Sequence, residues 1–369
     1  MGAKFNVVQP SSPEWTGFYE VPGILLIRLM SRCNEKCVFC MVMDEIERSD
    51  DVVFEQAVAR IEAQPPGTQI EFFGGEPTIY PRFLDLLRTA RRLGHRCSIA
   101  SNIRIFHSRT FTDQVAALDP TQIYIRTSIY GDTPELHDYY TAAPGSFAQT
   151  VRGLANIVAA GFPSQVNVVI MRENYRLLPR MAEAVHAWGV PRIKFGNLMS
   201  VDQCAAHAVA LPDVRPFLIK AIERAERLGL AVTVEKTPVC IVDGRLDLMS
   251  TERVLYGAAR VYDDAGACGG CLVRRWCDGL DPGYARQFGV AGLETLTSVP
   301  ARVVRRRPDA SHEPELLKMY CVEIADTPLD DPTLHGLERT WALVEEKHGI
   351  LAVFPSSYLR KAAPASTSA

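Results

Sequence analysis

Residues 24–40 read Ile-Leu-Leu-Ile-Arg-Leu-Met-Ser-Arg-Cys-Asn-Glu-Lys-Cys-Val-Phe-Cys, and this stretch decides the fold. Its first part, Ile24–Met30, is a largely apolar run that predicts a buried strand. The strand leads into Cys33, Cys37 and Cys40, with the spacing C-x3-C-x2-C. Thiolates gathered in one short loop suit a metal centre, yet a four-iron cluster usually takes four protein thiolates. Three cysteines would therefore leave one iron open for a ligand that is not protein.

With Phe39 directly before its last cysteine, the motif resembles the hallmark of the radical S-adenosylmethionine (SAM) superfamily. The resemblance implies that the open iron binds the amino and carboxylate groups of SAM. One electron from the cluster would then cleave SAM to methionine and a 5′-deoxyadenosyl radical, and Phe39 would lie against the adenine unless it is a simple core aromatic. The alternative, a structural zinc knuckle, needs a further Cys or His close by, and the next histidine is His95.

A second element, Gly74-Gly75-Glu76-Pro77, follows an apolar run and matches the Gly-Gly-Glu-Pro element of the same family. Glycines let a backbone approach a ligand closely, because they carry no Cβ. A carboxylate beside them can accept a hydrogen bond from an ammonium group. By resemblance, Gly74, Gly75 and Glu76 therefore hold the methionyl amino group of SAM. Five further positions would face the SAM ribose and carboxylate by resemblance, with a polar turn residue as the alternative for each: Ser101, Asn102, Ser128, Asn167 and Arg172.

Short apolar segments alternate with stretches of helical periodicity in the first half of the chain. The predicted strands are Ile24–Met30, Gln69–Phe73, Arg96–Ser101, Gln122–Ser128, Ser164–Met171 and Arg192–Gly196. The predicted helices between them include Val53–Ala63, Phe83–Leu93, Ser146–Ala160, which Ser146 could cap, and Tyr175–Trp188. Such alternation predicts an α/β fold with a parallel sheet. Six units resemble the partial (β/α)6 TIM barrel of the radical SAM core, where chemistry gathers at the C-terminal ends of the strands.

A second group of cysteines follows the barrel pattern. Cys268, Cys271 and Cys277 have the spacing C-x2-C-x5-C, and Cys240 lies upstream. Four thiolates can fully ligate one [4Fe-4S] cluster. The spacing resembles the core of the auxiliary-cluster extensions called SPASM and twitch domains, although a complete SPASM domain would have a cysteine where this chain has Asp281. We therefore expect a truncated, twitch-like domain with one auxiliary cluster.

Other ligand sets for the second site stay open. Cys321 is an alternative fourth ligand, and Cys204 is a weaker one. Four cysteines in a tetrahedral arrangement would also suit zinc. Cys97 lies within a predicted strand and is expected to be a buried, small apolar residue.

Composition narrows the class of protein. The chain has 369 residues, of which 40 are basic and 43 acidic, so its net charge of -3 makes nucleic acid an unlikely partner. It holds no apolar run long enough for a membrane span and no secretion signal, so we expect a cytoplasmic protein whose ten cysteines serve metal sites rather than disulfides. The expected organisation is a lead-in (1–22), the radical SAM core (23–200), the auxiliary-cluster domain (201–300), a C-terminal extension (301–355) and a disordered tail (356–369).

The two sites together favour a radical SAM oxidoreductase. The deoxyadenosyl radical would abstract a hydrogen atom from the substrate, and the auxiliary cluster would oxidise the substrate radical; Tyr284 and Asp243 are weak candidates for catalytic residues. An external donor such as flavodoxin or ferredoxin would supply electrons. Only about 22 residues precede the first predicted strand, which favours a small biosynthetic metabolite over a peptide. The alternatives are a maturase of a ribosomal peptide, a redox-neutral decarboxylase or epimerase and, in another class, a zinc-binding scaffold protein.

Overall fold

The structure of the protein is a computed structural model. It describes residues 17–21, 24–40, 51–198, 202–245, 248–249, 261–274, 277 and 279–297. The chain forms two compact units, and the boundary between them falls between Val232 and Thr233. The first unit contains the cysteine loop at Cys33, and the second contains the cysteines from Cys240 onward.

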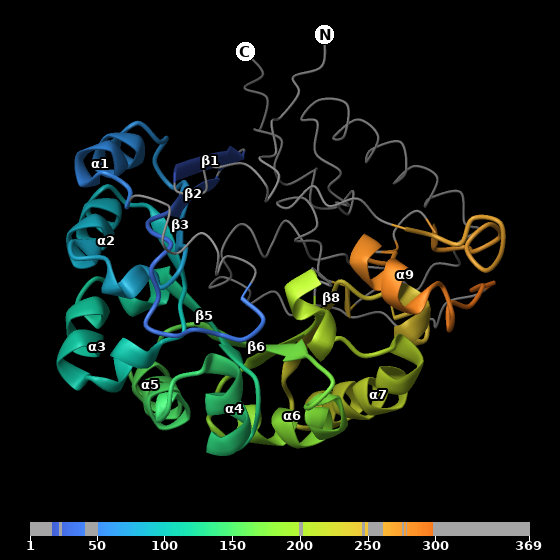
Figure 1. Ribbon diagram of the computed structural model, residues 1–369. Coiled ribbons are helices and arrows are strands. Elements are labelled where there is room, and N and C mark those ends of the chain that lie inside the picture. The colour runs from blue at the N-terminus through green and yellow to red at the C-terminus, as the bar shows by residue number, and fades with distance from the viewer. Residues whose placement is uncertain are drawn as a thin grey trace, which may run out of the picture. The chain divides into compact units, whose positions relative to one another are not determined.

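The first unit is built on a sheet whose strands follow one another in chain order, as Figure 1 shows. The strands are β1 (Gly17–Val21), β2 (Ile24–Arg28), β3 (Gln69–Phe73), β4 (Arg96–Ala100), β5 (Ile123–Ile129), β6 (Ser164–Ile170), β7 (Arg192–Asn197) and β8 (Ala231–Glu235), within which the boundary between the units falls. Strand β1 is antiparallel to β2, and the six strands from β2 to β7 are parallel. The expected α/β fold of the radical SAM core, with six parallel strands in a partial barrel, is confirmed.

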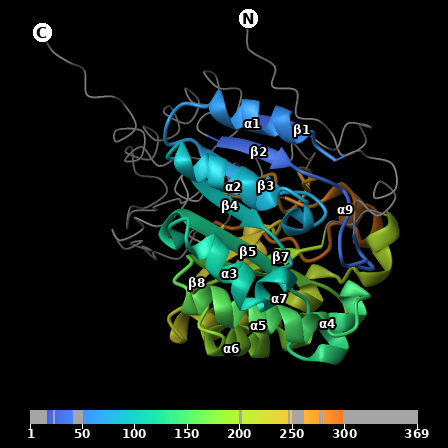
Figure 2. The same ribbon diagram turned by 90° about the vertical axis from the view of Figure 1, so that its left-hand side faces the viewer.

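Helices cover the outer face of this sheet, as Figure 2 shows. The described α-helices are α1 (Phe54–Glu62), α2 (Phe83–Arg92), α3 (Arg109–Ala116), α4 (Pro134–Thr141), α5 (Ser146–Ala159), α6 (Leu178–Ala187), α7 (Leu211–Arg227) and, in the second unit, α9 (Pro282–Phe288). Short 3-10 segments lie between them: η2 (Pro77–Ile79), η3 (Arg104–His107), η4 (Pro120–Gln122), η5 (Tyr175–Leu177), η6 (Asp202–His207) and η7 (Val239–Val242). Because the connections are helical, the parallel strands are joined by crossovers that leave their C-terminal ends at one edge.

Side chains alternate between the two faces of each strand. Phe72 of β3 points outward, where its ring meets that of Phe83 on α2 at 5.7 Å between centroids. Its neighbour Glu71 points inward and forms an ion pair with Arg126 of β5, although β4 lies between these two strands in the sheet. Strands that are not adjacent can share such a pair only because the sheet curves around a common interior.

The segment before β2 differs from the prediction, because residues 17–21 of the expected lead-in form strand β1. The sequence Gly17-Phe18-Tyr19-Glu20-Val21 is rich in aromatic and β-branched residues, and all five residues pair with β2. Prolines near this short run masked its strand character. Ser146 also behaves differently: it is the first helical residue of α5 rather than its cap.

The boundary between the units lies later than the expected one at residue 200. Helix α7 packs on α6 through an apolar stripe that includes the buried residues Val214, Leu218 and Ala221, which places it with the barrel. The predictions for Cys321, for residues 301–355 and for residues 356–369 lie outside the described residues. Among the helices that the structure describes, none is long and apolar enough to cross a membrane.

Candidate metal centres and cofactor site

The loop that carries Cys33, Cys37 and Cys40 is held by the C-terminal end of α4. The last carbonyl groups of an α-helix have no partner within the helix. In α4 the carbonyl of Thr141 accepts the N–H of Lys36 at 2.9 Å, and that of Tyr140 accepts the N–H of Val38 at 2.9 Å. The backbone of the cysteine loop therefore completes the helix end, and the helix end fixes the loop.

The three thiols of this loop influence one another electrostatically. Burial, together with the nearby acidic groups Glu76 and Glu35 and the thiol of Cys40, raises the pKa of Cys33 to about 12. Burial and the charges of Glu35, Cys33 and Cys40 also raise the pKa of Cys37. Thiolates crowded in this way become stable when a cation lies between them, since a coordinating thiol is deprotonated by its metal. These three thiols fit a four-iron cluster in which three irons have protein ligands and the fourth iron is open to another ligand.

The two glycines after β3 make room for the backbone that leads into Cys33. A Cβ on Gly75 would lie 2.1 Å from the carbonyl oxygen of Arg32, and one on Gly74 would lie 2.3 Å from that of Met30. This close approach allows two backbone hydrogen bonds. The N–H of Gly75 donates to the carbonyl of Met30 at 2.7 Å, and the N–H of Glu76 donates to the carbonyl of Arg32 at 2.9 Å. Within the protein, the glycines therefore serve to bring the end of β3 against the cysteine loop.

Glu76 joins the ends of β3 and β4. Its buried carboxylate accepts hydrogen bonds from the N–H of Thr78 at 3.0 Å, the hydroxyl of Ser101 at 2.8 Å and the N–H of Asn102 at 2.7 Å. Asn102 in turn donates its amide to the side chain of Asn34 at 2.6 Å, next to Cys33. Three residues predicted to bind SAM, namely Glu76, Ser101 and Asn102, thus form one connected group beside the cysteine loop.

The other predicted SAM residues lie on β5 and at the end of β6. A hydrogen bond links the side chains of Ser128 and Tyr130, and the side chain of Asn167 accepts from Gln165 at 2.7 Å. Arg172 is exposed and forms an ion pair with Glu173 at 3.0 Å. Ser128 and Asn167 are partners in the register of β5 and β6, Asn167 is the middle residue of β6, and Arg172 follows the end of that strand.

Phe39 belongs to an aromatic group. Its ring meets those of Tyr130 and Tyr140 edge to face, with centroids 4.9 and 5.8 Å away. His137 stacks on Tyr130 at 5.4 Å. This group packs one side of the cysteine loop, so the position of Phe39 depends on α4, which carries His137 and Tyr140.

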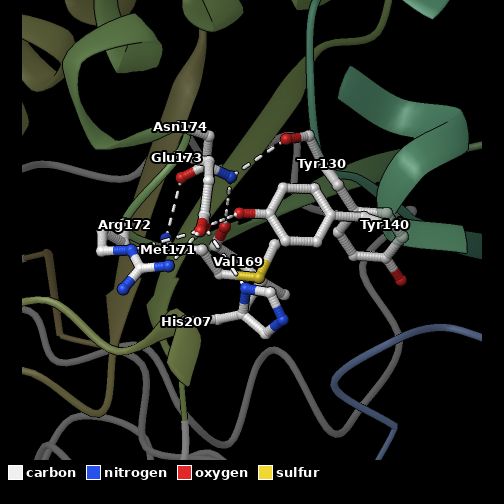
Figure 3. A network of polar contacts seen from close by, with 8 residues as sticks. All are labelled: Tyr130, Tyr140, Val169, Met171, Arg172, Glu173, Asn174 and His207. Carbon is white, nitrogen blue, oxygen red and sulfur yellow. Dashed lines mark hydrogen bonds and ion pairs between the residues drawn. The ribbon is translucent and has the colours of Figure 1, made fainter. Parts of the chain in front are cut away.

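Figure 3 shows a network of polar contacts at the end of β6. The carboxylate of Glu173 accepts hydrogen bonds from the hydroxyl of Tyr140 and from Arg172, and it lies 3.4 Å from Nδ1 of His207. Burial would raise the pKa of Glu173, but the hydrogen bonds from Tyr140 and Arg172 outweigh it and the pKa is lowered. The negatively charged carboxylate of Glu173 therefore links α4, the end of β6 and η6.

Asn174 fixes the turn on which Glu173 lies. Its side-chain oxygen accepts the N–H of Met171 at 2.8 Å, and its amide donates to the carbonyl groups of Val169 and Tyr130 at 2.8 and 3.0 Å (Figure 3). The sequence analysis missed Glu173 and Asn174. Their signal was present, because they directly follow Arg172 at the C-terminal end of a predicted parallel strand.

Glu35, inside the cysteine motif, is a further residue that the sequence analysis missed. It is 5% exposed, and its Oε1 has no hydrogen-bond partner within the described part of the chain. Its other oxygen lies 3.6 Å from Sγ of Cys37. Burial raises the pKa of Glu35 to about 7.

Cys204 lies in the first unit, near the cysteine loop at Cys33, and not among the cysteines of the second unit. Its buried thiol donates to the carbonyl of Phe39 at 3.1 Å, and it interacts electrostatically with Cys40. Cys204 was an alternative ligand for the second site. The structure places it with the barrel instead, in a different unit from Cys240, Cys268, Cys271 and Cys277. Cys97 lies in β4 and is buried, as its position in the sequence predicts.

The second unit contains a cavity lined by four cysteines. Its lining includes Cys240, Cys268, Cys271 and Cys277, which brings together the residues predicted to form the auxiliary site. The non-atom space in this cavity, including its opening to solvent, is about 310 Å³. Cys277 accepts two backbone N–H···S hydrogen bonds, from Val239 and Gly279 at 3.4 Å each.

The cavity and its hydrogen bonds bear on what the second site would hold. A single zinc ion holds its sulfur ligands at about 2.3 Å from one point. A cavity lined by four thiols has room for a larger group such as a four-iron cluster, whose properties depend on hydrogen bonds to its sulfur atoms like those that Cys277 accepts.

Asp281, at the position where a complete SPASM domain has a cysteine, has a structural role. Its carboxylate accepts the N–H groups of Gly283 and Tyr284 at 2.9 and 3.1 Å and so caps α9. Tyr284 itself is buried, with its ring 4.9 Å from that of Phe288. Asp243 is exposed, with a φ of 53° in the left-handed region. Neither weak candidate for a catalytic residue is placed in a cluster of reactive groups by these contacts.

Part of the barrel resembles a known protein family. Residues 27–185 match the family described as the radical SAM superfamily. The chain is 27% identical over 183 residues to the tungsten-containing aldehyde ferredoxin oxidoreductase cofactor-modifying protein of Pyrococcus furiosus. This match covers 47% of this chain and 51% of that protein. It is 30% identical over 187 residues to the PqqA peptide cyclase of Ruegeria pomeroyi, covering 50% of this chain and 48% of that protein.

Among solved structures, SuiB of Streptococcus suis bound to S-adenosylmethionine matches with a TM-score of 0.49 and 16% identity. That match covers 60% of this chain and 52% of SuiB. The chain thus spans about half the length of the curated relatives that it matches. The matched region contains Cys33, Cys37, Cys40 and the Gly-Gly-Glu-Pro element.

Proposed function

We propose that this chain is a radical SAM oxidoreductase that uses two iron–sulfur clusters on a small biosynthetic metabolite. Cys33, Cys37 and Cys40 would hold a cluster with one open iron for SAM. Cys240, Cys268, Cys271 and Cys277 would hold an auxiliary cluster in a twitch-like domain. The observation that carries the oxidative reaction is the cavity that these last four thiols line.

The residues around the first site support this proposal, because they would offer partners to the methionyl group and to the adenine of SAM. The connected group of Glu76, Ser101 and Asn102 lies beside Cys33, where the amino and carboxylate groups would chelate iron. Phe39 lies within an aromatic group with Tyr130 and Tyr140, which would suit a contact with the adenine. When bound, SAM and the first cluster would supply a 5′-deoxyadenosyl radical that removes one hydrogen atom from the substrate.

The second site would complete the oxidation. Four protein thiolates leave no iron open, so substrate ligation is disfavoured and electron transfer is favoured. The substrate radical would pass one electron to this site and release one proton, which makes the net reaction a two-electron oxidation when the hydrogen atom is included. An external donor such as flavodoxin or ferredoxin would supply the electron that cleaves SAM. No described side chain is assigned as the base.

A peptide is the second candidate substrate, and the names of relatives favour it. The PqqA peptide cyclase and a mycofactocin maturase of Mycobacterium ulcerans, which is 30% identical over 191 residues, are among the matched proteins. Other matched proteins are an Fe-coproporphyrin III synthase and a haem synthase, whose names point to small molecules. Both substrate classes use the same first step, removal of a hydrogen atom.

Anaerobic reconstitution tests the proposal. Protein reconstituted with iron and sulfide should bind about eight irons per chain, because each four-iron cluster contributes four. With SAM and dithionite it should form 5′-deoxyadenosine. Protein that carries zinc instead of iron and forms no 5′-deoxyadenosine would show that the enzyme assignment is wrong and that a metal-binding scaffold is right.

A further inference from the structure

The backbone of the cysteine loop is held at Lys36, Val38 and Phe39 by segments that lie far away in the sequence. Helix α4 accepts the N–H groups of Lys36 and Val38, as described above. Segment η6 adds a third contact, from the thiol of Cys204 to the carbonyl of Phe39 at 3.1 Å. The stretch from Lys36 to Phe39 therefore depends on the relative position of α4 and η6.

One carboxylate ties these two segments together. Glu173 accepts the hydroxyl of Tyr140, the residue of α4 whose own carbonyl holds Val38. The same oxygen, Oε2, lies 3.4 Å from Nδ1 of His207 in η6. The backbone adds a second link, because the N–H of Arg172 donates to the carbonyl of His207 at 2.8 Å.

The rings repeat the same connection. Tyr140 packs against Phe39 at 5.8 Å and against His207 at 5.6 Å between centroids. Tyr140 and His207 are buried, whereas Glu173 is partly exposed. The side chain that anchors the buried ring is thus within reach of solvent, and it is held as an anion by its hydrogen-bond donors.

We infer that Glu173 is a positioning residue for SAM: through Tyr140 and His207 it sets the place of Phe39 and of the cysteine loop. It acts through these residues and does not touch the reacting atoms. The inference rests on the proposed function, because it concerns the loop that would hold the first cluster and SAM. Loss of the contact to Tyr140 should leave the cluster in place and weaken SAM binding, since the loop would keep its cysteines and lose its alignment.

Tyr140→Phe tests this most directly, because it removes one hydroxyl and keeps the ring against Phe39. Losing a hydrogen bond to a charged group should raise the dissociation constant for SAM about tenfold. SAM binding is measured by titrating the reconstituted protein and following the change that SAM produces in the electron paramagnetic resonance spectrum of the reduced first cluster. The spectrum without SAM and the iron content should stay those of the wild type. Tyr139→Phe is the matched control, since its neighbouring side chain is 53% exposed, and it should bind SAM as the wild type does.

A double-mutant cycle separates a shared contact from independent effects. Glu173→Ala should weaken SAM binding at least as much as Tyr140→Phe, and the double variant should be no weaker than Glu173→Ala, because both changes remove the same bond. Glu173→Gln should bind SAM better than Glu173→Ala, since its amide oxygen can still accept the hydroxyl of Tyr140. His207→Gln tests the η6 side separately and should also weaken binding while the iron content stays unchanged.

The outcomes distinguish the inference from the function on which it rests. A wild-type protein whose cluster spectrum ignores SAM would overturn both. A wild type that responds to SAM, with Tyr140→Phe and His207→Gln unchanged in affinity, would overturn the inference alone. Additive losses in the cycle would also overturn it, because Glu173 and Tyr140 would then act through different contacts.

Discussion

The two cysteine sites differ in how the backbone serves the sulfur atoms. In the first site the N–H groups of Lys36 and Val38 go to the carbonyls of α4, and Cys33 accepts one N–H, from Glu35 at 3.4 Å. In the second site Cys277 alone accepts two N–H groups, and a backbone hydrogen bond from Glu294 lowers the pKa of Cys240, although burial raises it more. In the first loop the backbone N–H groups thus go mainly to another segment of the chain, whereas in the second site they go to sulfur atoms.

Polar surroundings widen this difference. Carboxylates and amides lie beside the first loop: Glu35, Glu76 and Asn102. Cysteines and apolar residues such as Val273 and Leu293 form most of the lining of the cavity in the second unit, and Arg274 and Glu294 are its charged members. A site that must chelate a charged amino acid group needs polar neighbours, whereas one that only carries an electron needs enclosed sulfurs. The comparison therefore supports the proposal that the first site binds SAM and that the second site transfers an electron.

Removing a ligand of the first site should have the largest effect. Cys37→Ala should abolish formation of 5′-deoxyadenosine and lower the iron content from about eight to about four per chain, because three protein ligands are already the minimum for an open cluster. Iron analysis and chromatography of the SAM products measure both. The comparison breaks if this variant still cleaves SAM at the rate of the wild type. Cys97→Ala is the control, since its buried thiol lies in β4, outside both cysteine motifs.

Removing a ligand of the second site should separate the two activities. Cys277→Ala should also lower the iron content to about four per chain, yet 5′-deoxyadenosine should still form, because the first cluster remains. Formation of the oxidised product should be lost. The readout is the ratio of product to 5′-deoxyadenosine at equal iron in the first site. Unchanged product formation would remove the role of the second site as an electron acceptor.

A glycine substitution tests the close packing of the first loop. In Gly75→Ala the new Cβ would meet the carbonyl oxygens of Arg32 and Ser31 at 2.1 and 2.3 Å. Overpacking of this kind costs about 1–3 kcal/mol, so the thermal unfolding midpoint should fall and SAM binding should weaken. Gly270→Ala, between Cys268 and Cys271, is the matched variant of the second site, because nothing lies within 4 Å of its new Cβ. Equal losses in both variants would contradict the difference in packing.

The smallest expected effect concerns pH and the aromatic group beside the first loop. Burial lowers the pKa of His137 from its ordinary value of 6.5 to about 4. Between these two values the unfolded chain binds a proton that the folded protein does not, so stability falls as the pH is lowered through this window. At about pH 5.5 the loss should be about 1 kcal/mol.

His137→Phe should reduce the drop in the unfolding midpoint between about pH 7.5 and pH 5.5, because the ring no longer titrates. His186→Phe, at an exposed position of α6, should keep the drop of the wild type. If His137→Phe loses as much stability as the wild type over this range, the buried neutral ring is not its source.

The parallel strands and most of their helices could be predicted from the sequence, because each carries its own signal. The predicted strand Gln69–Phe73 coincides with β3, and the predicted strands that begin at Arg96 and Arg192 begin where β4 and β7 begin. Helix α4 gave little signal, since Pro-Glu-Leu-His-Asp-Tyr-Tyr-Thr has no apolar face. Its helical form depends on partners, among them the cysteine loop that takes up its last carbonyls.

The spacing of cysteines along the chain was enough to propose a set of ligands for each site, because ligand number and spacing are local properties. Only the tertiary structure decided that Cys204 belongs beside Phe39, and that Tyr140, Glu173 and His207 meet. These residues come from three crossovers of the barrel, and contacts between distant crossovers follow from the curvature and register of the sheet. That information is spread over the whole fold, so no short stretch of sequence carries it.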